Sequence, residues 1–440
     1  MQRVFTLITL YVCLLHGPQA AAQQATDLTL RDAVAQALAQ NPDVQIANLS
    51  RVEAEAGYEQ SRSQLLPQFS ASAVQRRQTS NLQGIGLAFP GFPSRVGPFN
   101  AFDARPQFSQ TVLDLGAWQS IRAAKQRIAQ ADAGEQAVRQ ATALAVISLY
   151  LQAIELESRM AAGQSRLKSA GAVERQVNAA YQEGTASKLD FSRAVLQTQS
   201  ERAALNALEG SLAITKQALL RLLGKRENID LRLADNLDSL GGNPTPIDAA
   251  EKAAIEKNPE LLALRHGVAA ARSDALKARM QRLPKVSFVA DYGVNGRTPS
   301  ASLSTYQYAG VVEFPIFTSG RIGGEIKAAQ ARLHRAEESL RAGELKVLAE
   351  LRGSHAEWNA AREGAEAARL AVAAARENLD LSRARYDAGI ADSVSVLQAQ
   401  ASLAELENLQ ISTLVTRELA LARLLFASGN VVAYLDHGRP

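Results

Sequence analysis

The feature that most constrains this chain is a stretch of 67 residues, 116–182, that contains no proline and is rich in Ala, Leu, Gln, Glu and Arg. These residues are strong helix formers, so the stretch is predicted to be one continuous helix. At 1.5 Å per residue, such a helix is ~100 Å long. A compact domain cannot enclose a rod of this length, and the chain is therefore predicted to be an extended helical protein.

A second proline-free stretch of nearly equal length, 320–387, follows in the other half, and both stretches end in Tyr-x-x-Gly. The Asn-Pro pairs that begin at Asn41 and Asn258 lie 217 positions apart, as do Pro67 and Pro284. A constant spacing of this kind indicates an internal repeat. We expect repeat 1 at 23–224, a linker or equatorial segment at 225–245, repeat 2 at 246–429 and a loosely held tail at 430–440.

Each repeat is predicted to begin with a helix that runs past its Asn-Pro pair to the stop at Pro67 or Pro284. Alternating apolar and polar residues then predict strands near 68–78, 105–113, 285–294 and 306–317. Strands of this length can cross a bilayer when tilted. The intervening segments 80–103 and 295–305 are rich in Gly, Pro, Ser and Asn and are predicted to be loops.

Each long helix is expected to turn at its Tyr-x-x-Gly and to continue into a return helix, at 188–223 and 394–426. Along the second long helix, Ile326, Leu333, Leu340 and Val347 are spaced by sevens. This spacing is typical of a coiled-coil seam.

Residues 1–22 carry Arg3 as their one charge, an apolar run and a small-residue site at 20–22, which together predict a secretory signal peptide with cleavage near Gln23. The one cysteine, Cys13, lies in this leader and lacks the small residue expected before a lipid-bearing cysteine. No other stretch approaches the length and hydrophobicity expected of a transmembrane helix. An exported protein, periplasmic, secreted or in the outer membrane, is expected.

The residues give no sign of an enzyme. Removing the leader leaves 47 basic and 44 acidic residues, and they are interleaved as on a solvated helix face, so no nucleic-acid partner is expected. Neither a phosphate-binding glycine loop nor a nucleophile elbow is present. His266, His334, His355 and His437 lack the spacing of a zinc site, and we predict no metal and no cofactor.

The order of helix, proline, strand, loop, strand, long helix, Tyr-x-x-Gly turn and return helix, present twice, resembles the TolC-type outer-membrane efflux factor family. The resemblance covers nearly all of the mature chain. It implies a mainly α fold with a membrane β-barrel, in which a very long α-helical coiled-coil barrel continues a trimeric β-barrel with four strands per protomer. Four strands cannot close a barrel, so this reading requires oligomerisation.

The resemblance also implies functional residues. The two turns match the periplasmic tips at which family members contact an adaptor, and the matching residues are Gly184, Thr185, Ala186, Gly389, Ile390 and Ala391. Tyr386 and Asp190 match a pair that helps to hold the family's tunnel closed. An alternative is that these two polar residues simply face water beside a turn.

Two departures from the family pattern put a tight gate in doubt. Ser395 and Gln398 stand at the constriction positions where the family often has two aspartates. Ala391 and Leu189 stand where an arginine and a threonine form a second latch, so that latch is missing.

The function implied is a passive exit duct for a tripartite efflux pump or a type I secretion system, in the outer membrane with its helical part in the periplasm. Its expected partners are two further copies of the chain, a periplasmic adaptor, an inner-membrane transporter and outer-membrane lipid. The alternative is a soluble periplasmic coiled-coil scaffold or adaptor. Drugs, metal ions, oligosaccharides and proteins all remain possible cargo.

Overall fold

The computed structural model describes residues 26–86, 91, 93–225, 231–237, 242, 244, 246–388, 390 and 393–436, so the predicted leader lies outside the described residues. Contacts divide the chain into two compact units. Unit 1 comprises residues 1–44, 139–254 and 349–440, and unit 2 comprises 45–138 and 255–348. Each unit draws on both halves of the chain, so the boundaries of the predicted repeats are not those of the compact units.

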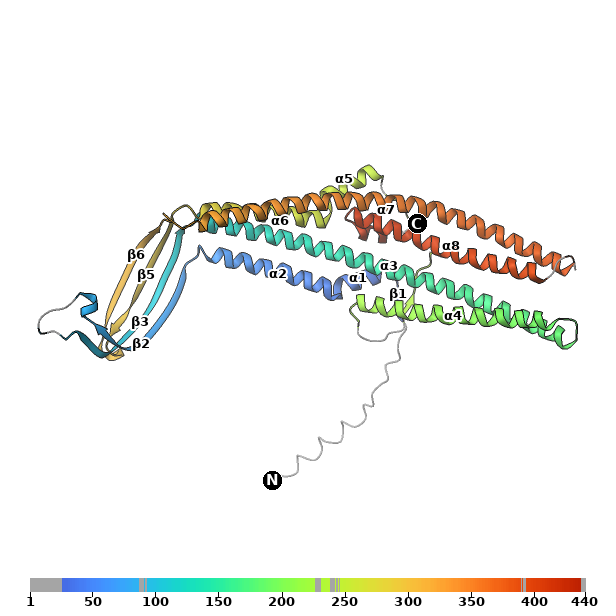
Figure 1. Cartoon of the computed structure of the whole chain (residues 1–440), viewed down its shortest axis with the longest axis horizontal. Helices are drawn as coiled ribbons and strands as arrows, with labels where there is room; N and C mark the ends of the chain where they lie inside the picture. Colours follow the sequence, from blue (N-terminus) through green and yellow to red (C-terminus); the bar gives the residue numbers. More distant parts are fainter. Residues whose placement is uncertain are drawn as a thin grey trace, which may run out of the picture. The chain divides into compact units, whose positions relative to one another are not determined.

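The helices and long strands follow one order in both halves (Figure 1). The first half contains α1 (Leu30–Gln40), α2 (Pro42–Ser63), β2 (Gln68–Asn81), β3 (Arg95–Leu113), α3 (Leu115–Gln182) and α4 (Lys188–Leu222). The second half contains α5 (Ile247–Lys257), α6 (Pro259–Met280), β5 (Lys285–Gly296), β6 (Ser302–Glu313), α7 (Arg321–Asp387) and α8 (Ser393–Ala427). Corresponding helices have 11 and 11, 22 and 22, 68 and 67, and 35 and 35 residues.

The first helix of each half does not run through its Asn-Pro pair as predicted but ends there. Asn41 is extended, with φ −63° and ψ 130°, and its side chain accepts a hydrogen bond from the backbone N–H of Asp43 at 2.8 Å. Asn258 is likewise extended and caps α6. The cause is local, because proline disfavours helical backbone in the residue before it and is tolerated at the first position of a new helix.

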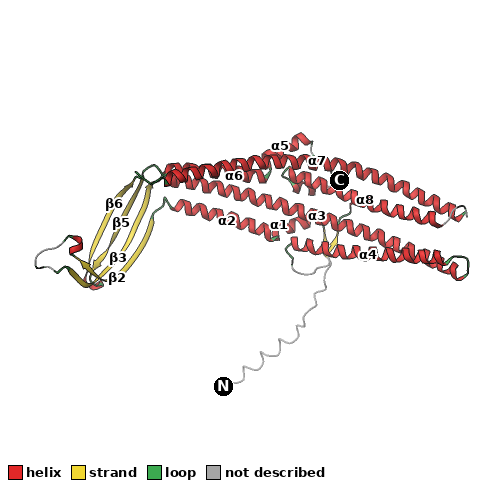
Figure 2. Cartoon of the chain, in the orientation of Figure 1, coloured by secondary structure: helices red, strands yellow, loops and turns green. Residues whose placement is uncertain are grey.

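Unit 2 contains an antiparallel sheet in the order β2-β3-β5-β6, which forms the group of long strands in Figure 2. Strand β3 begins at Arg95, ten residues earlier than predicted, because residues assigned to the loop pair with β2 as far as Asn81. Strand β6 covers Ser302–Glu313 rather than 306–317, and it ends before Pro315, which has no N–H to donate to a sheet.

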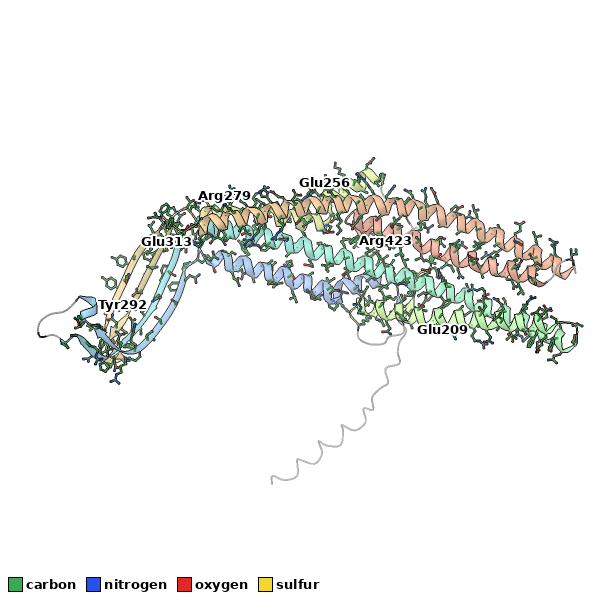
Figure 3. All side chains as sticks on the ribbon, in the orientation of Figure 1. Glu209, Glu256, Arg279, Tyr292, Glu313 and Arg423 are labelled. Atoms are coloured by element: carbon green, nitrogen blue, oxygen red, sulfur yellow. The ribbon has the colours of Figure 1, made fainter. Side chains whose placement is uncertain are left out.

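The two faces of the sheet differ in chemistry. One row of aligned residues crosses all four strands as Phe69, Phe108, Ala290 and Tyr308. The next row crosses on the opposite face as Ser70, Gln107, Asp291 and Gln307. Aromatic rings meet on the first face, with centroids 5.0 Å apart for Phe69 and Phe108 and 6.0 Å apart for Phe108 and Phe288. Tyr292, also on this face, is labelled in Figure 3. The sheet therefore has an apolar face and a polar face.

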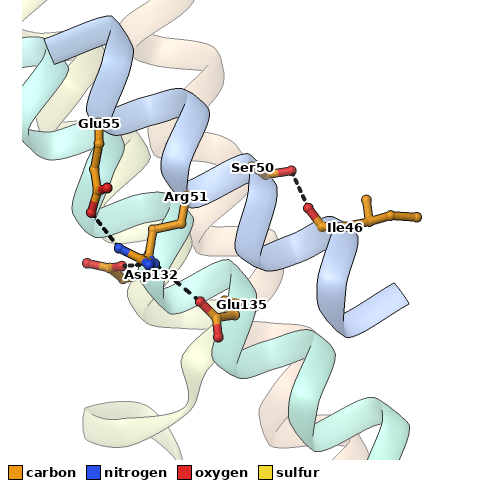
Figure 4. Close-up of polar contacts among 6 residues, drawn as sticks. All are labelled: Ile46, Ser50, Arg51, Glu55, Asp132 and Glu135. Atoms are coloured by element: carbon orange, nitrogen blue, oxygen red, sulfur yellow. Dashed lines mark hydrogen bonds and ion pairs between the residues drawn. The ribbon is translucent and has the colours of Figure 1, made fainter. Parts of the chain in front are cut away.

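In unit 2, one arginine on α2 forms ion pairs that link this helix to α3 (Figure 4). Arg51 forms an ion pair with Glu55 on its own helix and lies 3.8 Å from Asp132 and 3.5 Å from Glu135 on α3. The planar guanidinium suits such shared pairing, since its five N–H groups point in several directions. The contact fixes which face of α2 meets α3.

Unit 1 has the main hydrophobic core, which is built from α1, α4, α8 and parts of α3 and α7. Tyr150, Ile147 and Leu151 of α3 are fully buried in it. The Tyr150 hydroxyl lies 2.7 Å from the carbonyl oxygen of Leu28 and 2.8 Å from a carboxylate oxygen of Asp235. Burial, followed by the hydrogen bond to Asp235 and its negative charge, raises the pKa of Tyr150 far above its usual value.

Parts of the predicted linker and of the predicted tail belong to regular elements of unit 1. Within the predicted linker, β4 (Leu231–Leu233) pairs in parallel with β1 (Thr26–Leu28). In the predicted tail, the 3₁₀ helix η4 (Val431–Asp436) buries Val431 and Tyr434. The prediction of a loosely held tail was therefore wrong for residues 431–436, because the burial of Val431 and Tyr434 depends on tertiary contacts.

The prediction that no further stretch resembles a transmembrane helix was also wrong. By length and composition alone, one described helix, α3, is apolar enough to cross a membrane. Its apolar residues between Ala143 and Ile154 lie in the core of unit 1, which accounts for their hydrophobicity.

Coiled-coil seams run along the helices of unit 1. On α4, Thr198, Leu205, Leu212 and Leu219 are buried at intervals of seven. On α7, Leu351, Trp358, Ala365, Val372 and Leu379 are buried at the same interval. This repeat keeps one face of each helix against its neighbour.

Candidate functional site

The α3–α4 turn, residues 183–187, connects the two helices of one hairpin in unit 1 and has its own backbone hydrogen bonds. The N–H groups of Thr185 and Ala186 donate to the carbonyl oxygen of Ala180 at 2.8 and 3.1 Å. Gly184 has φ +77°, a conformation that favours glycine. No atom lies within 4 Å of a Cβ built on Gly184, so glycine is required here by the backbone and not by crowding.

The next helix starts with a capping motif. The Ser187 hydroxyl accepts from the N–H of Asp190 at 3.1 Å and donates to its carboxylate at 2.6 Å. Across the turn, the rings of Tyr181 and Phe191 stack with centroids 5.7 Å apart. Neither contact was predicted from the sequence, although a serine three residues before an acidic residue is a sequence signal for a helix start.

The α7–α8 turn repeats the first hydrogen-bond pattern where it is described. The N–H of Ile390 donates to the carbonyl oxygen of Arg385 at 2.9 Å, which matches the bond from Thr185 to Ala180. Ile390 is 70% exposed. Gly389 and Ala391 of the predicted adaptor contact lie outside the described residues.

The predicted latch remains a prediction. Asp190 is half-buried and already accepts from Ser187, and the Arg193 guanidinium lies 3.9 Å from its carboxylate. Tyr386 belongs to α7, but its side chain lies outside the described part of the chain. The Asp190 side chain is therefore positioned at the start of α4 by its hydrogen bonds with Ser187, the N-cap residue of that helix.

The constriction candidates lie on one helix, in the first turns of α8. Ser395 is half-buried and Gln398 is exposed. Leu189, at the position of the missing second latch, is 58% exposed. Neither Ser395 nor Gln398 carries a charge, so these positions cannot form the acidic ring of the family pattern.

Ion pairs between the stems hold each helical hairpin together. Arg166 on α3 pairs with Glu201 on α4 at 3.1 Å, and Arg376 on α7 pairs with Glu407 on α8 at 3.1 Å. Within α7, hydrogen bonding from Arg369 lowers the pKa of the exposed carboxylate of Glu366. The stems of both hairpins are thus linked by ion pairs, and exposed residues lie at both turns, among them Gly184, Thr185 and Ile390.

Among the described residues, no group of three or more His, Cys, Asp or Glu is placed to hold a metal ion.

Comparison with known proteins defines the class to which this fold belongs. The sequence pattern of the outer membrane efflux protein family matches residues 33–225 and 251–430, one segment in each half. The chain therefore belongs to the outer membrane efflux protein family. This membership places it in the outer membrane and decides against the soluble scaffold alternative.

Individual relatives cover most of the chain. It is 25% identical over 422 residues to outer membrane protein OprJ of Pseudomonas aeruginosa, which is 92% of this chain and 84% of OprJ. It is 22% identical over 388 residues to outer membrane protein TolC of Escherichia coli, which is 84% of this chain and 75% of TolC. The Campylobacter jejuni CmeC outer membrane channel has the same fold, with a TM-score of 0.81 at 17% identity over 93% of this chain and 89% of CmeC.

Proposed function

We propose that three copies of this chain form a passive exit duct across the outer membrane, in which each copy supplies four strands to one β-barrel. The observation that carries this proposal is the chemistry of the sheet: an apolar face with aromatic residues and a polar face, on strands of 12 to 19 residues. Membrane barrels alternate apolar outward and polar inward residues in this way. The sheet order leaves β2 and β6 as edges, which pairing with neighbouring copies would satisfy.

Two structural repeats and an α-helical barrel complete the proposed architecture. The matched helix lengths of the two halves support an internal duplication. The heptad seams of α4 and α7 support helices that pack side by side along their length. The proposed helical part lies in the periplasm, and residues 1–22 act as the leader for export.

The α3–α4 and α7–α8 turns are the proposed contact with a periplasmic adaptor. Exposed turns are accessible to a partner, and Ile390 offers a large apolar side chain that is 70% exposed there. The contact residues proposed are Gly184, Thr185, Ala186, Gly389, Ile390 and Ala391. The Tyr386–Asp190 latch and the lining positions Ser395 and Gln398 belong to the same proposal. An inner-membrane transporter would supply the energy, and the chain itself would not act as an enzyme.

The experiment that tests the duct is the mass of the detergent-extracted protein by light scattering, after inner and outer membranes have been separated. Outer-membrane material at about three chain masses, with single-channel conductance in a planar bilayer, is the expected result. A monomer in the periplasmic fraction would refute the proposal.

A further inference from the structure

The polar face of the sheet contains a cluster of three charged residues, Asp103, Arg105 and Asp291, here named the Arg105 cluster. The Arg105 guanidinium contacts Asp103 through two parallel bonds of 2.6 Å, from Nε to Oδ1 and from Nη2 to Oδ2. Its third nitrogen, Nη1, donates to Asp291 on β5 at 3.0 Å. A guanidinium held by two carboxylates is oriented more strictly than one in a single surface pair.

Small residues around Arg105 let its side chain lie along the sheet. On β5, a Cβ built on Gly293 would collide with the Cβ of Arg105, so only glycine permits this approach. On β2, the residue aligned with Arg105 is Ser72. Arg105 and Asp291 have side chains only 20% and 18% exposed although they lie on a single-layered sheet. The arginine is thus held against the sheet surface and does not extend from it.

The cluster belongs to the face that would line a water-filled lumen. Arg105 precedes Gln107 by two residues on the same strand, and Gln107 aligns with Asp291 in the polar row. The opposite face has the Phe and Tyr side chains and would meet lipid. Charged groups at bilayer depth are expensive on the lipid side and tolerated in a lumen.

We propose that the Arg105 cluster sets the ion selectivity of the barrel lumen by holding one cation against the wall between two anions. This inference rests on the proposed duct function. Arg76, which aligns with Ala101, lies on the same face. The positive charges of Arg76 and Arg105 therefore balance the negative charges of Asp103 and Asp291 in this part of the wall. Rings of charged side chains decide which ions a pore favours, and a compensated wall favours neither sign.

The test uses reversal potentials of the full-length trimer in planar bilayers under a KCl gradient. Arg105→Gln leaves two carboxylates without their cation, and the K⁺ to Cl⁻ permeability ratio is expected to rise several-fold. The double variant Asp103→Asn with Asp291→Asn frees the guanidinium, and the ratio is expected to fall several-fold. The triple variant, which neutralises all three groups, is expected to lie between these two.

A matched control is Arg77→Gln, which removes the same charge one residue from Arg76 but on the apolar face. It is expected to leave the ratio unchanged. Both cluster shifts are expected to weaken at 1 M salt, where the Debye length is only ~3 Å. A purely structural role for the cluster would not give opposite, salt-dependent shifts.

The outcomes separate the two levels of inference. Wild-type protein that forms no conducting trimer refutes the duct itself. A conducting wild type, with cluster variants that assemble but leave the ratio unchanged, refutes only the role of the Arg105 cluster. If Arg105→Gln does not assemble, Asp291→Asn alone, which leaves the bidentate bonds to Asp103, must lower the ratio, and an unchanged ratio refutes the proposal.

Discussion

At the scale of single residues, Asp114 joins strand β3 to helix α3. Its carboxylate accepts from the N–H of Ala117 at 3.0 Å and lies 3.0 Å from the ammonium group of Lys285. Burial alone would raise the pKa of Asp114, but the hydrogen bond from Ala117 and the charge of Lys285 outweigh it and hold the pKa below its usual value. A carboxylate with a lowered pKa contributes stability above its unfolded pKa and loses it as the pH falls through the folded pKa.

Asp114→Asn keeps a capping side chain but removes the charge. At pH 7 it is expected to lower the free energy of unfolding by ~0.5–1 kcal/mol, and the difference should shrink below pH ~4 as wild-type Asp114 becomes protonated. Chaotrope unfolding in detergent at pH 7 and pH 3 measures this. Asp114→Ala serves as control, since it also removes the cap and should cost ~1 kcal/mol more at neutral pH. A pH-independent difference for Asp114→Asn would contradict the explanation.

Gly184 shows the effect of backbone conformation without crowding. Gly184→Ala places a Cβ in open space but forces φ +77° on an L-residue, so we expect a loss of ~1–2 kcal/mol. Gly210→Ala, in the interior of α4 and also without neighbours within 4 Å, is the matched control and should gain up to ~1 kcal/mol. Thermal unfolding followed by circular dichroism checks both, and equal effects would show that the turn does not depend on φ.

At the scale of elements, η4 closes the end of α8. The Tyr434 hydroxyl donates to buried Glu418 at 3.0 Å, and Arg417 pairs with the same carboxylate at 2.8 Å. Burial, followed by the negative charge of Glu418, raises the pKa of Tyr434 far above its usual value, so the phenol remains a donor throughout the working range. The tail is therefore attached by a polar contact inside an apolar core.

Tyr434→Phe keeps the ring but leaves Glu418 with one partner fewer. We expect a loss of ~1–3 kcal/mol in the free energy of unfolding, measured by chaotrope titration. Adding Glu418→Gln replaces the charge by a neutral amide, so the double variant should be less destabilised than the sum of the two single changes. Strict additivity would show that the two side chains do not act together.

At the scale of the whole molecule, α4 is apolar on two opposite sides. Its buried seam faces unit 1, while Leu189, Leu196 and Ile214 are 58%, 70% and 73% exposed on the other side. Their spacings of 7 and 18 residues place them on one face of a helix. A helix with apolar residues on opposite faces is normally covered on both. In the proposed trimer, a neighbouring copy covers the exposed side.

Leu196→Glu is accordingly expected to reduce the trimer to smaller species while the far-ultraviolet circular dichroism stays unchanged. Light scattering in detergent gives the mass. Arg202→Glu, an exposed change on the same helix, is the control and should leave the trimer intact. Trimers of normal stability in the Leu196→Glu protein would place the subunit interface elsewhere.

Local sequence patterns were enough to predict most of the fold. The two long helices, the turns between helices and the strands each depend on residues only a few positions apart. Absence of proline, glycine at the turns and alternating polarity therefore predict them. The order of helices, strands and turns in each half resembles that of the TolC-type family, and the match to the outer membrane efflux protein family confirms this resemblance. The contact residues at the turns remain predictions.

Pairing across the chain was decided by the tertiary structure. The pairing of β4 with β1 joins residues from opposite ends of the first half of the chain. The start of β3 at Arg95 depends on its pairing with Asn81, and Tyr434 is held by Glu418, both of which lie outside the reach of a local repeat pattern. The same holds for the Arg105 cluster, because Asp291 reaches Arg105 only through the register of β3 with β5. Register is fixed by which faces and neighbours fit together, and no local pattern contains that information.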